Sequence, residues 1–300
     1  MTAARGTDTW FAGSMAALAV ATGTLFGMAV GALPGAAAGA AAGAGMGALL
    51  WRALTARAAR RERVRRTPFP EAWRRILEER YDHYHRLPAT LRPRFEVQVA
   101  LFLAEKRITG VEVEVDEELR VLVAASAATL TAAWEGDDHW NHLAEVLLYR
   151  RDFGRDYSFD DDDLSGQAHP WGTVILSVPT LQDSFDDPDD GFHVALHEFA
   201  HLLDVEQTHF DGVPRGLDAE TSRQWLLLVD KELDRLRRGK SVLDPYAAED
   251  PVEFLAVAVE TFFERPLALR RRHREVYALL RDYFAQDPAE WDDRRGLEEY

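Results

Sequence analysis

Hydrophobic and polar residues follow one pattern near the N-terminus and another in the rest of the 300-residue chain. No residue between Asp8 and Arg52 is charged. Residues 10–33 alone are long enough to cross the hydrocarbon core of a bilayer, which is about 30 Å thick. The next run, residues 35–51, has Gly at close to every fourth position, which would let a second helix pack closely on the first. The pattern predicts an N-terminal hydrophobic membrane segment, either one helix or a helical hairpin.

Arginines gather directly after this uncharged run. The chain has a net charge of −16; residues 1–66, with eight arginines and two acidic side chains, contribute +6, and residues 67–300 therefore carry −22. By the positive-inside rule, the arginines stay on the cytoplasmic side of a membrane. We therefore expect the protein in the inner (cytoplasmic) membrane, with its C-terminal part facing the cytoplasm. The alternative is an Ala/Gly-rich leader that never inserts.

The pattern after residue 66 is typical of a globular domain. Three segments have apolar residues at helical spacing: residues 70–87, 92–106 and 218–239. Two segments read as strands: residues 111–115, which alternate, and residues 171–178, which are mostly apolar. Strands come before a His-rich helix near residue 197, and helices follow it. This order predicts an α+β domain over residues 67–300, separate from a membrane anchor and Arg-rich segment in residues 1–66.

The composition removes several classes of function. The chain has no cysteine, which excludes disulfides, thiolate metal ligands and a cysteine nucleophile. A domain with a net charge of −22 would repel the phosphate backbone, so we expect no direct nucleic-acid binding. Any metal must therefore be held by His, Asp or Glu.

The stretch VALHEFAHLLD, residues 194–204, contains a candidate metal site. In the pattern H-E-x-x-H, His197 and His201 lie one turn apart on the same helix face, so both imidazoles can bind one zinc ion. Glu198 follows His197 directly and lies next to it around the helix, so it can accept a proton from the attacking water. The alternative is a structural His pair in the core, but burying two imidazoles and a carboxylate without a partner is costly.

A third ligand is needed, and its position separates the types of zinc peptidase. The extended motif, H-E-x-x-H-x-x-G-x-x-H, would require Gly at 204 and His at 207. The sequence has Asp204 and Gln207 instead, which excludes zinc peptidases with this three-histidine motif. A later segment predicted to be helical supplies Glu253, Glu260 and Glu264 instead. The residue pattern alone leaves the choice of carboxylate open.

Glu253 has an alternative explanation. Asp250 is a good N-cap, Pro251 fits the first helical position, and a Glu at the third position can close a capping box without binding a metal. The sequence pattern does not separate a cap from a ligand.

Four motifs together resemble the MtfA-type zinc-dependent peptidases: GTVILSVPTLQDSFD, LHEFAHLLD, DGVP and YAAEDPVEFLAVAVETFFERP. The resemblance covers about residues 68–290 and implies a zincin-like, gluzincin-type site in a zinc metallopeptidase domain. In that site His197, His201 and Glu253 bind zinc, and Glu260 supports a ligand from outside the coordination sphere. Two departures from the family pattern, Leu202 and the extra His209, bear on substrate preference.

Several further residues have candidate roles. Tyr246, in the family's Y-A-A position, either donates a hydrogen bond to the developing oxyanion or simply packs. Asp204 is expected to orient a ligand imidazole or neighbouring backbone. His193 lines the cleft or lies on the surface. We expect residues 172–178 to form an edge strand that pairs with an extended substrate. A calcium site at residues 160–163 is a minor alternative to a solvated loop.

The resulting prediction is a membrane-tethered, cytosol-facing zinc metallopeptidase acting on a peptide or protein. Two rival functions remain. The resemblance also implies a regulatory protein that binds and sequesters a transcriptional repressor, with peptidase activity secondary. The other rival is a membrane scaffold in which zinc only ties helices together.

Overall fold

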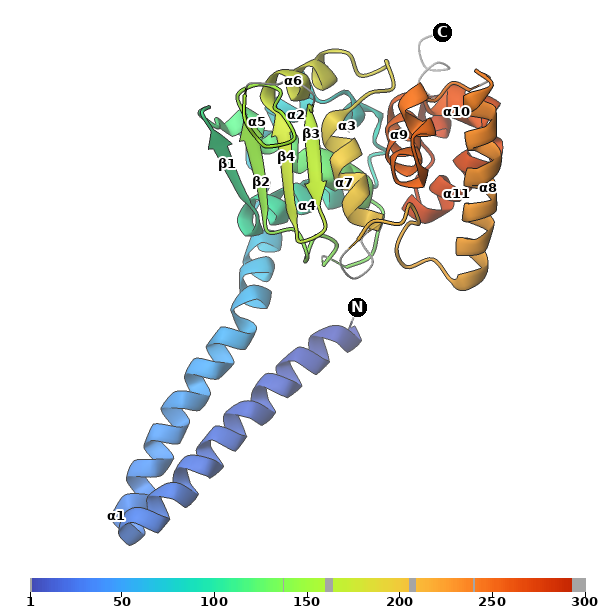
Figure 1. Cartoon of the computed structure of the whole chain (residues 1–300). Helices are drawn as coiled ribbons and strands as arrows, with labels where there is room; N and C mark the ends of the chain where they lie inside the picture. The colour runs from blue at the N-terminus through green and yellow to red at the C-terminus, as the bar shows by residue number, and fades with distance from the viewer. Residues whose placement is uncertain (1, 137, 160–163, 205–208, 240, 293–300) are drawn as a thin grey trace. The chain divides into compact units, whose positions relative to one another are not determined.

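The computed structural model describes residues 2–136, 138–159, 164–204, 209–239 and 241–292 (Figure 1). The chain divides into two compact units, Met1–Pro68 and Phe69–Tyr300.

The first unit is a long helix, α1 (Thr2–Arg66), that folds back on itself (Figure 1). A Cβ added at Gly43 would lie 2.6 Å from the backbone oxygen of Ala19, and one added at Gly47 would lie 2.9 Å from that of Ala16. Such separations leave room only for glycine, so the two halves of α1 touch through their backbones. The close packing expected from the spaced glycines is therefore present.

The expected membrane segment is wrong: among the described residues, no helix is long and apolar enough to cross a membrane. An uncharged run of sufficient length therefore did not predict a membrane span here. The membrane partner expected from the same run is not supported either, and the cytoplasmic location of the second unit stays a prediction.

The second unit has a four-stranded mixed sheet. Its strands are β1 (Arg107–Val111), β2 (Glu145–Tyr149), β3 (Gly166–His169) and β4 (Thr173–Ser177). They lie in the order β1-β2-β4-β3, in which β3 alone is antiparallel to its neighbour. The two faces differ: Val146 and Val174 point into the main core, while Tyr149 and Ile175 form a smaller cluster with Phe153.

Helices cover the face of the sheet that points into the main core and continue beyond it. The helices are α2 (Glu71–Arg80), α3 (Asp82–Arg86), α4 (Arg92–Glu105), α5 (Glu117–Thr131), α6 (Val178–Asp186), α7 (Val194–Asp204), α8 (Ala219–Arg237), the 3-10 helix η1 (Pro245–Ala248), α9 (Pro251–Glu264), α10 (Pro266–Arg272) and α11 (Arg274–Phe284). Helix α7 lies between β3 and β4 on one side and α9 on the other (Figure 1). Residues on the sheet, on α7 and on α9 can therefore meet.

Most of the expected elements are confirmed, with one shifted strand. The helices predicted at residues 92–106 and 218–239 are α4 and α8, and the α+β class of the second unit holds. The strand predicted at residues 111–115 is wrong, since β1 ends at Val111. Glu112 has φ = 57°. This left-handed backbone conformation, unusual for a residue other than glycine, ends the strand.

Candidate metal centre

Helix α7 carries His197, Glu198 and His201, and it lies in the interior of the second unit. All of its residues are buried, because the helix packs against α5, α9, β3 and β4. His197 and His201 are one turn apart, with ring centroids separated by 4.8 Å. Two imidazoles therefore face the same region from a helix that packing holds still.

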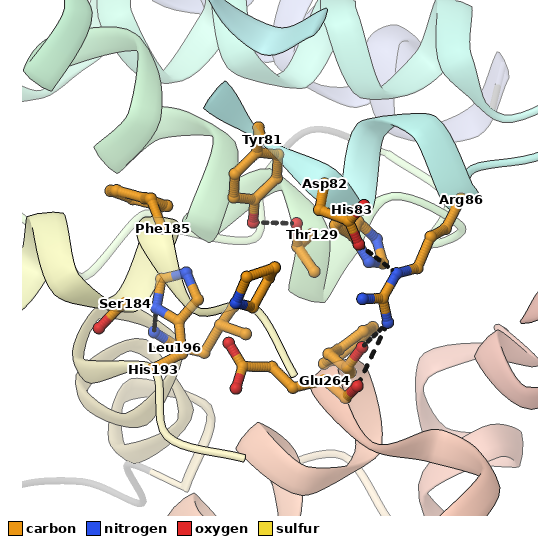
Figure 2. Close-up of a pocket in the computed structure, with 12 residues that line it drawn as sticks. Tyr81, Asp82, His83, Arg86, Thr129, Ser184, Phe185, His193, Leu196 and Glu264 are labelled. Carbon is orange, nitrogen blue, oxygen red and sulfur yellow. Dashed lines mark hydrogen bonds and ion pairs between the residues drawn. The ribbon is translucent and has the colours of Figure 1, made fainter. Parts of the chain in front are cut away.

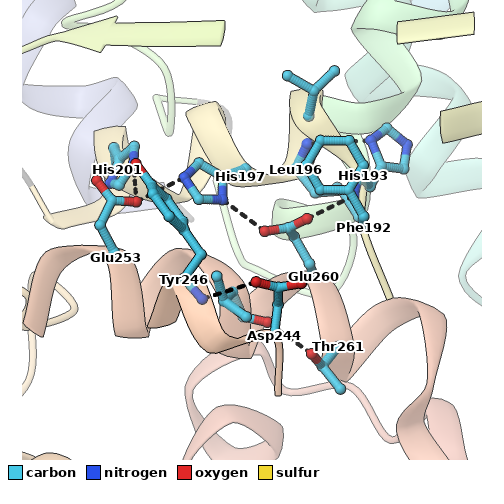
Figure 3. A network of polar contacts seen from close by, with 12 residues as sticks. Phe192, His193, Leu196, His197, His201, Asp244, Tyr246, Glu253, Glu260 and Thr261 are labelled. Atoms are coloured by element: carbon cyan, nitrogen blue, oxygen red, sulfur yellow. Dashed lines mark hydrogen bonds and ion pairs between the residues drawn. The ribbon is translucent and has the colours of Figure 1, made fainter. Parts of the chain in front are cut away.

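Glu253, from the first turn of α9, completes a convergent group (Figure 3). Its Oε2 lies 3.0 Å from Nε2 of His197 and 3.7 Å from Nε2 of His201. One ligand atom from each of the three residues lies within 4.8 Å of the others. The side chain of Asp250 accepts hydrogen bonds from the backbone of Val252 and Glu253, so the cap is present while the Glu253 carboxylate points to the histidines.

Glu260, two turns further along α9, approaches His197 from its other side (Figure 3). Its Oε1 lies 2.6 Å from Nδ1 of His197, and its Oε2 accepts a hydrogen bond of 2.6 Å from the backbone N–H of His193. Glu260 is only 1% exposed. Its two bonds hold the imidazole so that Nε2 faces Glu253 and His201.

The carboxylates of Glu253 and Glu260 favour positive charge at His197. Burial opposes the charged form of His197, but Glu260 and Glu253 outweigh burial and raise its pKa well above the ordinary value. Burial lowers the pKa of His201 to about 3, with repulsion from His197 added. Carboxylates that stabilise an imidazolium at one point also stabilise a metal cation there.

Glu198 lies beside this group, against the edge strand β3. It is 5% exposed. Burial raises its pKa to about 8, and the nearby Glu253 and Glu260 contribute, while a hydrogen bond from the backbone of Ala168 acts in the opposite direction. The sequence motif identified Glu198, but nothing in it indicated contact with β3.

A cleft of about 280 Å³ opens at His197 and Glu198. Apolar side chains line part of it, among them Phe192, and Tyr246 from η1 lies on its wall. The Tyr246 ring is centred 6.0 Å from that of His197, and the residue is 44% exposed. Burial, followed by the nearby Glu253, raises the pKa of Tyr246 to about 12, so its hydroxyl keeps its proton at neutral pH. Phe192 was not foreseen from the sequence.

Asp204 lies at the end of α7 and orders the backbone that follows. Its carboxylate accepts hydrogen bonds from the backbone N–H groups of Asp211, Gly212 and Val213, at 3.0, 2.8 and 3.3 Å. Of the two expected partners, the neighbouring backbone is therefore the one it contacts. The extra His209 is exposed, and the proposed calcium segment, residues 160–163, lies outside the described residues.

The expected edge strand is wrong. β4, within residues 172–178, pairs on both sides, with β2 and with β3. The edge nearest α7 is β3, and its second side has no strand partner among the described residues. A tight turn at residues 170–172 adds this extra strand, and Gly172, with φ = 97°, supplies the backbone conformation for it. The short run SGQAH just before that turn was the available sequence signal.

His193 is neither in the cleft nor on the surface. It borders a small cavity of about 20 Å³ between α3, α7 and α9 (Figure 2). His83 and Glu264 also line it, and burial raises the pKa of Glu264 to about 10. Burial lowers the pKa of both histidines to about 3, so they are neutral at neutral pH.

Comparison with known proteins identifies the group to which this site belongs. Residues 56–285 match the model of the glucose-regulated metallo-peptidase M90 family. The chain belongs to this family. The match covers the sheet, the His-Glu-His helix and α9. Together with the similarity to Mlc titration factor A proteins, it confirms the resemblance to the MtfA-type peptidases.

Several proteins are similar in sequence to this chain, and three of them illustrate the range. An uncharacterized protein of Synechocystis sp. is 30% identical over 245 residues, which cover 76% of this chain and 89% of that protein. Mlc titration factor A of Yersinia enterocolitica is 32% identical over 186 residues, covering 57% and 67%. Mlc titration factor A of Edwardsiella ictaluri is 28% identical over 235 residues, covering 72% and 85%.

Membership in a metallo-peptidase family implies a metal, and the convergent group fits one. Two imidazole nitrogens and one carboxylate oxygen are a donor set found in catalytic zinc sites, in which a further position stays open. Here the cleft beside His197 provides that open side. The Nδ1 atom of His197 is already held by a carboxylate, as is usual for a metal-binding imidazole.

Proposed function

We propose that the chain is a zinc-dependent peptidase in which His197, His201 and Glu253 bind the metal. The observation that best supports this is the convergence of their three ligand atoms beside an open cleft. When bound, zinc would lower the pKa of a water molecule and polarise the scissile carbonyl.

The residues around the metal ligands have separate roles in this proposal. Glu198 acts as general base and accepts a proton from the attacking water at its carboxylate, because it lines the cleft next to His197. The positive charge of a bound zinc ion would lower the pKa of Glu198 from about 8 and keep the carboxylate ionised. Tyr246 keeps its proton and donates a hydrogen bond to the oxygen that becomes negative in the transition state. Glu260 orients His197, and Asp204 orders the backbone at residues 211–213.

The substrate in this proposal is a peptide bound along β3. The second side of this edge strand has no strand partner among the described residues, so an extended chain could pair there with the backbone groups other than that of Ala168, which already hydrogen-bonds Glu198. A peptide in that position would pass Glu198, which lies against the same strand.

Metal analysis and a peptide assay test the proposal together. The purified full chain should contain about one zinc ion per molecule after zinc loading. It should hydrolyse members of a panel of fluorogenic peptides, lose activity with a chelator, and regain it with zinc. Stoichiometric zinc without hydrolysis of any peptide would contradict the catalytic part, and failure to bind zinc would contradict the metal site.

The names of the relatives favour a second candidate. Mlc titration factor A is, by its name, a protein that titrates Mlc. The same property can be tested in this chain: metal-stripped and zinc-loaded protein are titrated with purified Mlc by calorimetry. Equal binding by both forms, together with an absence of peptide hydrolysis, would favour a regulatory protein that sequesters a partner over an enzyme.

A further inference from the structure

Gly166, the first residue of the edge strand β3, lies in direct contact with the proposed base. A Cβ built on Gly166 would lie 2.5 Å from Oε1 of Glu198 and 2.8 Å from its Cγ. It would also lie 2.8 Å from Cγ2 of Val194. Non-bonded atoms do not approach so closely in folded proteins, so a side chain at position 166 forces something to move.

The strand itself is tied in place. Gly166 pairs with Leu176 of β4. Just before it, Leu164 and Phe153 exchange two backbone hydrogen bonds of 2.9 and 3.0 Å, and the backbone N–H of Ser177 donates to the oxygen of Ser165 at 2.8 Å. Moving β3 away from α7 would break these bonds.

Helix α7 is equally constrained on the other side. All of its residues are buried, and it packs against α5, α9 and both β3 and β4. Close-packed interiors do not yield easily to an added methyl group. The atom in closest contact is Oε1 of Glu198, at the far end of a flexible side chain. The carboxylate of Glu198 is therefore the group that gives way most easily, and the stiffer Val194 side chain must also shift by a few tenths of an ångström.

We propose that Gly166 is a positioning residue that determines where the Glu198 carboxylate lies in the cleft. The strand acts on this carboxylate twice, through the space left at Gly166 and through the hydrogen bond from the backbone of Ala168. The catalytic consequence of this inference rests on the proposed function, in which Glu198 is the base.

Gly166→Ala tests the inference in the zinc-loaded full chain. Because a misplacement of about 1 Å can lower a rate by about 100-fold, kcat should fall by about 10–100-fold while KM and zinc content stay close to wild type. Gly45→Ala is the matched control: its added methyl group meets nothing within 4 Å, and we expect wild-type kcat. A kcat for Gly166→Ala within about twofold of wild type would overturn the proposal.

A shorter acid separates positioning from a general loss of structure. Glu198→Asp shortens this side chain by one methylene and Val194→Ala removes the Cγ2 atom, so the double variant relieves the contacts of the added methyl group with Oε1 of Glu198 and with Val194. In that background Gly166→Ala should lower kcat by less than about threefold. If the substitutions acted independently, Gly166→Ala would lower kcat by the same factor as it does in the wild-type background. That outcome would assign Gly166 a purely structural role.

Crystal structures of the zinc-loaded wild type and Gly166→Ala provide a readout that does not depend on activity. We expect the Glu198 carboxylate to move by about 1 Å or more while His197 and His201 keep their places. An unmoved carboxylate would overturn the proposal even if the wild type proved inactive. An inactive wild type with a displaced carboxylate in the variant would instead contradict the proposed function and leave the positioning role supported.

Discussion

Oε1 of Glu260 lies 2.6 Å from Nδ1 of His197, on the side of the imidazole opposite to Glu253. The two carboxylates are seven residues apart on α9, so they lie on the same face of the helix, one near each nitrogen of the ring. This arrangement gives them different expected roles. Glu253 faces the point where the ligand atoms converge, and Glu260 contacts Nδ1 on the opposite side of the His197 ring.

Glu253→Gln should weaken zinc binding by more than about 100-fold, because a neutral amide is a much weaker donor to a divalent cation than a carboxylate. Activity should fall with the metal content. The fold should lose at most about 1 kcal/mol, since the Asp250 cap does not depend on the Glu253 side chain. Competition titration with a zinc-binding dye measures the affinity.

Glu260→Gln is the matched comparison on the same helix. Losing the carboxylate partner of His197 should weaken zinc binding by about 10–100-fold, less than the change at Glu253. Tight zinc in Glu253→Gln beside metal loss in Glu260→Gln would mean that the two carboxylates have exchanged roles.

Glu198→Gln should lower kcat by at least about 10²–10⁴-fold, the range ascribed to general acid–base help. The amide keeps the size and polarity of the side chain but cannot accept a proton. Zinc stoichiometry should be unchanged, because Glu198 is not among the three converging ligands. Turnover near the wild-type level would remove Glu198 from the mechanism.

Tyr246→Phe should lower kcat by about 10–100-fold and leave zinc affinity unchanged. Loss of one fully enclosed oxyanion donor costs about 10²–10³-fold, and the 44% exposure of Tyr246 makes a smaller effect expected. The assay is kcat on the best peptide of the panel. If KM rises while kcat holds, Tyr246 only binds substrate.

Glu264→Gln should stabilise the protein at high pH. Burial raises the pKa of Glu264 from 4.5 to about 10, so the folded chain holds this proton more tightly than the unfolded chain. The contribution of the carboxyl group to stability is therefore fully present below about pH 4.5 and is lost as the pH rises towards 10. Gln cannot ionise, and it can still accept the hydrogen bond from the backbone of Gly191.

We expect Glu264→Gln to be about 1–3 kcal/mol more stable than wild type at pH 9 and nearly equal at pH 4.5, as measured by urea unfolding. The exposed Glu249→Gln is the control and should give no such pH-dependent difference. A constant difference at both pH values would show that Glu264 does not titrate in this range.

The local parts of the site were readable from the sequence. His197, Glu198 and His201 could be placed together because the rise and turn of an α-helix determine which residues share a face over one turn. The cap at Asp250 and the long helix α8 follow from equally local rules, and both are present. Resemblance to the family, and not residue spacing, favoured Glu253 over Glu260 at the level of the sequence.

Tertiary structure decided everything that depends on residues distant in the chain. Only the packing of α9 on α7 brings Glu253 to one nitrogen of His197 and Glu260 to the other. Only the pairing of β3 with β4 makes β3 the edge, and only its approach to α7 puts Gly166 against Glu198. The sequence by itself determined which chemical groups share a helix face, because that depends on local geometry. Which carboxylate, strand and glycine meet them depends on long-range packing, and no local pattern encodes it.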